Sequence, residues 1–68
     1  MKYEWEATDI VARRIVRLSG NYTAMIVKQE GPTDTAPYAL IELMDGRSSA
    51  PMRRENMARH LTEIGAMP

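Results

Sequence analysis

The sequence predicts a small α+β domain, mostly β, in which a bent antiparallel sheet of three or more strands precedes one C-terminal helix. Two observations predict the sheet: apolar runs flank a Gly-Asn pair at 20–21, and a further apolar run, 38–44, ends at an Asp-Gly pair. A third observation predicts the helix, because after Met52 the apolar residues recur at every third or fourth position. With 68 residues the chain has room for a single domain, residues 1–68.

The first element, residues 9–19, fits two structures. A helix would begin near Asp9 and end at Gly20, a residue type that favours the backbone conformation found just after helices. A strand would form a hairpin with the next apolar run, with a bulge where Arg13-Arg14 interrupts the alternation. The hairpin is favoured because β-branched side chains suit a pleated sheet better than a helix. The β-branched residues of this stretch are Ile10, Val11, Ile15 and Val16.

The turn of this hairpin sets its register. With residues 20–21 as a two-residue turn, Val16 faces Met25 and Ile15 faces Ile26. These cross-strand pairs are apolar and of compatible size, so we expect them to stabilise the hairpin.

Local signals predict the remaining elements. Apolar runs predict strands over residues 22–29 and 38–44. Turn-forming residues are concentrated between them, which predicts a loop over residues 31–37. A short connection, 47–51, leads to a helix over 52–64 with Gly65 as its stop signal. The apolar stripe of this helix consists of Met57, Leu61 and Ile64.

Both central strands are apolar on both sides, whereas a sheet with one wet face would alternate apolar and polar residues. In the first of these strands, one side carries Tyr22, Ala24 and Ile26 and the other carries Met25 and Val27. In the second, one side carries Tyr38, Leu40 and Met44 and the other carries Ala39, Ile41 and Leu43. One helix covers only one side, so we expect the N-terminal segment, closure into a barrel or a second protomer to cover the other.

The chain carries three stretches, DIVARRIVRLSGNYTAMIV, YALIELMDG and RENMARHL, that resemble the small YodC-like bacterial proteins. In that family a VVRLxSGGxxMTV hairpin leads to a strand ending in an Asp-Gly turn and then to a short terminal element. The similarity spans roughly residues 9–61. It implies a compact, strongly bent antiparallel sheet of the SH3-like barrel type, and it implies no activity, because none is established for the family.

Composition argues against several classes of function. Nine basic residues balance nine acidic ones, whereas nucleic-acid-binding proteins usually carry a basic excess. The chain has no Cys and one His, His60, which argues against disulfides and a zinc site. We recognise no phosphate loop and no nucleophile–base arrangement, so we expect no enzyme, cofactor or metal. No apolar run reaches the length of a membrane span and the start lacks a signal-peptide core, so we expect a cytoplasmic protein.

The candidate partner-binding residues are aromatic and arginine side chains, the types that dominate binding hot spots. Tyr3 and Trp5 alternate in a polar segment and would point the same way on an edge strand. The alternative is that Trp5 closes the small core. Two clusters contain most of the arginines: Arg13, Arg14 and Arg17 form the first, and Arg53, Arg54 and Arg59 the second.

From size and composition, we expect a non-enzymatic protein-binding module. It would be a bacterial or phage-encoded regulator or inhibitor that blocks a surface of a larger macromolecular complex, for example a host defence complex. Its partner would be another protein or protein complex, or a second copy in a homodimer. The alternative is a small nucleic-acid-binding regulator, in which the arginines contact phosphates and Tyr22 and Tyr38 stack on bases.

Overall fold

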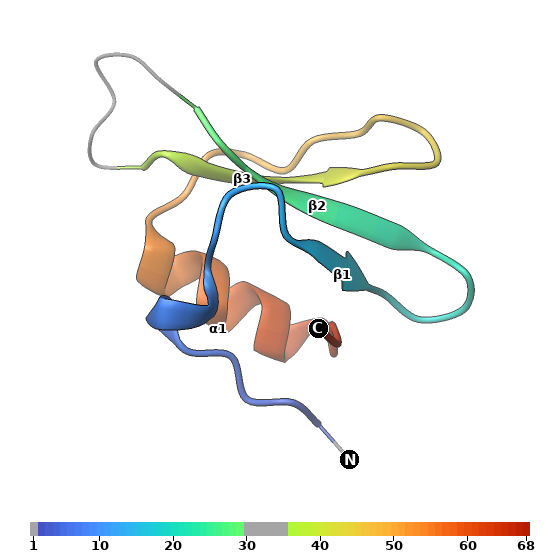
Figure 1. Cartoon of the computed structure of the whole chain (residues 1–68), viewed down its shortest axis with the longest axis horizontal. Helices are drawn as coiled ribbons and strands as arrows, with labels where there is room; N and C mark the ends of the chain where they lie inside the picture. The colour runs from blue at the N-terminus through green and yellow to red at the C-terminus, as the bar shows by residue number, and fades with distance from the viewer. Residues whose placement is uncertain (1, 30–35) are drawn as a thin grey trace.

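The computed structural model describes residues 2–29 and 36–68. Its elements in chain order are a short 3-10 turn η1 (Ala7–Asp9), the strands β1 (Ile15–Arg17), β2 (Thr23–Lys28) and β3 (Tyr38–Glu42), and the helix α1 (Arg54–Glu63). The strands form one antiparallel sheet in the order β1-β2-β3, and η1 and α1 lie on the same side of it (Figure 1). The predicted α+β class is confirmed. The barrel is not, because β1 and β3 are the outer strands and do not pair with each other.

Residues 9–19 contribute a strand and its bulge, so the helical interpretation is wrong. The backbone N–H of Arg13 donates to the carbonyl oxygen of Ile26 (2.6 Å), and the N–H of Ile26 donates to the carbonyl oxygen of Arg14 (2.9 Å). Two residues of one strand therefore face one residue of the other, which is the predicted bulge. Arg13 adopts a φ of 71°, a conformation uncommon for a residue with a side chain.

The register of the hairpin differs from the prediction by one residue. The N–H of Leu18 donates to the carbonyl oxygen of Tyr22 (2.9 Å), so the loop has three residues, 19–21, rather than two. As a result Val16 pairs with Ala24, and Ile15 pairs with Met25. A shift of one residue exchanges the two faces of a strand, and the observed register places Val16 and Ala24 together in the core.

The third strand is shorter than predicted because the chain turns at residues 43–45. β3 ends at Glu42, and Leu43 and Met44 are exposed in the turn that follows. Of the predicted loop 31–37, residues 31–35 lie outside the described part of the chain.

The free edge of β3 is covered by the segment 47–52. The backbones of Tyr38 and Met52 exchange two hydrogen bonds, 3.0 and 2.7 Å long. Further along, the N–H of Leu40 donates to the hydroxyl oxygen of Ser49 (2.9 Å), where a backbone acceptor would normally stand. Because this edge is already paired, it offers little to a further strand.

The core lies between the sheet and α1. The helix contributes Met57, Ala58 and Leu61, and the sheet contributes Val16, Ala24, Ile26, Tyr38 and Leu40. Trp5 and Ile10 close it from the N-terminal segment. That segment therefore packs on the same side of the sheet as α1, and the prediction that it covers the second face is wrong.

The end of α1 confirms the predicted stop signal at Gly65, although the helix covers 54–63 rather than 52–64. Gly65 has a φ of 74°, its N–H donates to the carbonyl oxygen of Thr62 (3.2 Å), and the N–H of Ala66 donates to that of Leu61 (2.9 Å). This is the Schellman arrangement. It reverses the chain so that Met67 pairs with β1.

We expect Trp5→Phe to destabilise the protein by about 1–3 kcal/mol, because the carbonyl oxygen of Ala66 loses the indole donor that now lies 2.8 Å away. Urea unfolding followed by circular dichroism measures the change. Tyr22→Phe alters an exposed ring and should stay within about 0.5 kcal/mol of the unmodified protein. Equal midpoints for the Trp5 variant and the unmodified protein would contradict this role of the indole.

Candidate functional site

The predicted aromatic pair, Tyr3 and Trp5, is part of the packing between the N-terminal segment and the helix. Trp5 is 6% exposed, and its indole N–H donates to the carbonyl oxygen of Ala66 (2.8 Å). Tyr3 packs edge-on against it, with ring centroids 5.0 Å apart. The segment is not an edge strand. Since the Trp5 ring offers almost no surface to a partner, the structure supports the alternative that Trp5 closes the core.

The first arginine cluster is divided by the fold. Arg14 is engaged within the molecule, because its guanidinium donates to the carbonyl oxygen of Asp9 (2.7 Å) and lies 5.9 Å from the centroid of the Trp5 ring. Arg13 is exposed at the bulge, and Arg17 is exposed on β1. Arg13 and Arg17 are therefore accessible to a partner. They lie at different places, because Arg13 belongs to the bulge and Arg17 belongs to β1.

The second cluster is divided in the same way. Arg54 donates to the hydroxyl oxygen of Tyr38 (2.6 Å) and lies 5.3 Å from the centroid of its ring. Arg53, just before α1, and Arg59, on α1, are exposed. Tyr38 is 3% exposed, so the prediction that it stacks on bases together with Tyr22 is wrong.

One side of the sheet is left without a helix. We call it the outer face, and its apolar members are Ile15, Met25, Val27, Ala39, Ile41 and Leu43, of which Ala39 is fully buried. Ile15 pairs with Met25 and Met25 pairs with Ile41, so three large side chains form a row across the three strands. Ile15 is 46% exposed, and Met25 and Ile41 are half-buried. Among the described residues, α1 and the N-terminal segment both pack on the opposite side (Figure 1).

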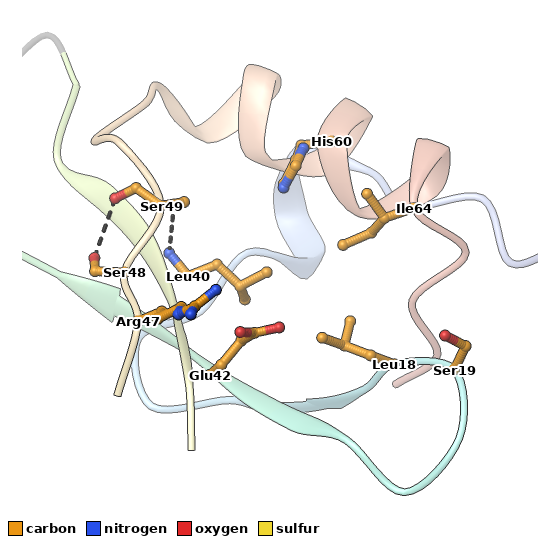
Figure 2. A pocket seen from close by; sticks show the side chains of 9 residues that line it. All are labelled: Leu18, Ser19, Leu40, Glu42, Arg47, Ser48, Ser49, His60 and Ile64. Carbon is orange, nitrogen blue, oxygen red and sulfur yellow. Dashed lines mark hydrogen bonds between the residues drawn. The ribbon is translucent and has the colours of Figure 1, made fainter. Parts of the chain in front are cut away.

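A second feature is a cleft of about 420 Å³ between the last turns of α1 and the sheet. Its apolar lining consists of Leu18, Leu40 and Ile64, and its polar lining consists of Ser19, Glu42, Arg47, Ser48, Ser49 and His60. Figure 2 shows the carboxylate of Glu42 and the ring of His60 directed toward the cleft from opposite walls. Pockets of roughly 300–1,000 Å³ with a few polar groups are typical of small-ligand sites.

The sequence analysis assigned no functional role to Glu42 or to His60. A signal for Glu42 exists, because it occupies the position between Leu40 and Met44 on the side of the strand that faces the helix. A charge in an otherwise apolar inward row indicates either an ion pair or an opening of the core. No signal in the sequence places His60 opposite Glu42, because that proximity depends on how α1 crosses the sheet.

The described residues contain no group of three His, Asp or Glu side chains that is close enough to hold a metal ion. In the same part of the chain, no helix has the length and apolar character needed to cross a bilayer.

No protein-family model matches this chain, and neither the curated proteins nor the solved structures include a significant match to it. The YodC-like resemblance therefore stays a prediction, and the assignment of function rests on the outer face and the cleft.

We expect Glu42→Leu to stabilise the protein by about 0.5–2 kcal/mol, because it replaces a half-buried charge with an apolar side chain that extends the core into the cleft. Thermal unfolding measures the gain. Glu63→Leu, on an exposed position of α1, should change stability by less than about 0.5 kcal/mol. A less stable Glu42 variant would show that the carboxylate supports the fold.

Proposed function

We propose that this chain is a non-enzymatic protein-binding module that docks through the outer face. The observation that carries the proposal is the row formed by Ile15, Met25 and Ile41, three large apolar side chains on the side of the sheet away from α1, of which Ile15 is 46% exposed. Burying such a row against another protein is favourable by about 25 cal/mol for each Å² of apolar surface removed from water. A bacterial or phage-encoded regulator or inhibitor that blocks a surface of a larger complex would act in this way.

Charge favours a foreign protein over a second copy. Arg17 extends from the same face of β1 as Ile15, whereas the outward strand positions, which are residues 15, 17, 23, 25, 27, 39 and 41, include no acidic residue. A partner with carboxylates around an apolar patch would match this face, whereas two copies would bring no carboxylate from the outward strand positions to meet Arg17. We therefore propose a partner that is another protein with an acidic rim.

The nucleic-acid alternative has less support. Arg14 and Arg54 bond within the molecule, so fewer arginines are available to contact phosphates. Tyr38 is buried, so its ring is not available to stack on a base. The chain as a whole is neutral, and neutrality weakens the counterion release on which phosphate binding depends.

Affinity purification from the source cells tests the proposal. We expect the unmodified chain to retain a protein in stoichiometric amount and Ile15→Glu to lose it by at least about tenfold, because a charge in the apolar row opposes burial. Tyr22→Glu is the matched control, since Tyr22 is 48% exposed against 46% for Ile15 and lies on the opposite side of the hairpin. Circular dichroism confirms that each variant is folded.

Equal recovery with Ile15→Glu and Tyr22→Glu would contradict docking through the outer face. Light scattering separates a homodimer from a foreign partner, because only a homodimer forms with the purified chain alone. In a parallel assay, mixed-sequence DNA and RNA binding that falls steeply between about 50 and 200 mM salt would favour the nucleic-acid alternative.

A further inference from the structure

We infer that the cleft between α1 and the sheet binds an organic cation, a primary ammonium group on an alkyl stem. This site is separate from the outer face, because its residues lie on the side of the sheet that packs against the helix. The inference therefore does not depend on the protein-binding proposal.

Glu42 supplies the charge that selects the ligand. Its side chain occupies the inward row of β3 after Tyr38 and Leu40, which are buried in the core. Within residues 2–29 and 36–68, the Glu42 carboxylate has no hydrogen-bond donor and no ion-pair partner. A half-buried carboxylate without a partner favours a ligand that brings a positive charge.

Arg47 lies beside Glu42 but forms no ion pair with it in this structure. Arg47 is held by the side chain of Asp45, which accepts from its backbone N–H (3.0 Å) and lies 3.5 Å from its Nε atom. Arg47 lines the cleft together with Glu42, and its charge is paired with Asp45, which lies outside the cleft lining. Among the described residues, Glu42 therefore has no ion pair of its own, whereas Arg47 has one with Asp45.

The opposite wall also favours a cation. His60 belongs to the last turns of α1 and is directed toward the cleft (Figure 2), so an imidazole nitrogen is available as a hydrogen-bond acceptor for an ammonium group. The C-terminal end of a helix carries a partial negative charge, and Ile64 at the cap of α1 lines the same cleft.

The apolar walls select the remainder of the ligand. Leu18, Leu40 and Ile64 line the cleft from β1's hairpin, β3 and α1, and they offer contact to methylene groups. A cleft of about 420 Å³ has room for a four-carbon stem such as that of a lysine side chain. The ammonium group would then lie between Glu42 and His60, with its stem against the three aliphatic side chains.

Titrations of ¹⁵N-labelled protein, followed by amide chemical shifts, test the inference with n-butylammonium chloride, n-butanol and sodium butyrate. We expect saturable shifts at Leu18, Leu40, Glu42 and His60 with n-butylammonium, and affinity at least about tenfold weaker for the alcohol and for the carboxylate. Equal responses to the three probes, or n-butylammonium shifts outside the cleft only, would overturn the inference. This comparison needs no variant.

Glu42→Gln provides the second test, since it keeps the shape of the side chain and removes its charge. We expect n-butylammonium to bind about tenfold more weakly to Glu42→Gln and with unchanged affinity to Glu63→Gln, whose carboxylate is exposed on α1 outside the cleft. Unchanged affinity for the Glu42 variant would contradict the assignment.

Nα-acetyl-lysine methylamide distinguishes the two sources of such a group. If this blocked lysine binds at least as tightly as n-butylammonium, the ligand is a lysine side chain of a protein. Binding of n-butylammonium alone identifies a free amine.

Discussion

One helix has to stabilise a sheet whose strands are apolar on both sides, and the rest of the structure follows from this constraint. α1 packs its Met57 and Leu61 against the inner face, and the N-terminal segment adds Trp5 and Ile10 to the same core. No described helix packs on the outer face, where Ile15 is nearly half exposed. In a chain of this length the ratio of surface to volume does not allow two complete cores. The open face is thus a consequence of size, and it is also the surface through which we propose that a protein partner docks.

The two ends of the chain are joined so that the single core is closed. The Schellman turn after α1 directs Ala66 to the indole of Trp5 and Met67 to the edge of β1, so a left-handed residue, Gly65, determines where the C-terminal residues pack. The hydrogen bond between Trp5 and Ala66 joins the N-terminal segment to the C-terminal residues. Each of these two segments therefore restrains the other. This explains why the only tryptophan, a residue type common in binding sites, is used here in the core.

The two candidate surfaces lie on opposite sides of the sheet and differ in chemistry. The outer face is apolar with Arg17 beside it, whereas the cleft contains Glu42 and His60 between aliphatic walls. Glu42 interrupts the inward row of β3 where a larger apolar residue would extend the core, and a charge without a partner costs stability. Proteins commonly accept such a cost where a ligand is bound.

The sequence by itself determined the features that depend on a few adjacent residues. The strand and helix runs, the bulge at Arg13-Arg14 and the stop at Gly65 all follow from local backbone preferences and apolar spacing. The tertiary structure decided the features that depend on distant contacts: the hairpin register, the burial of Trp5 and Tyr38, and the placement of His60 and Glu42 around one cleft. The register is one example, because both turn lengths are locally acceptable and only the match of Val16 and Ala24 with the helix-facing core selects between them. Local backbone preferences and apolar spacing determine where helices and strands form. Which side of a strand or helix remains available for binding depends on the other elements that pack against it.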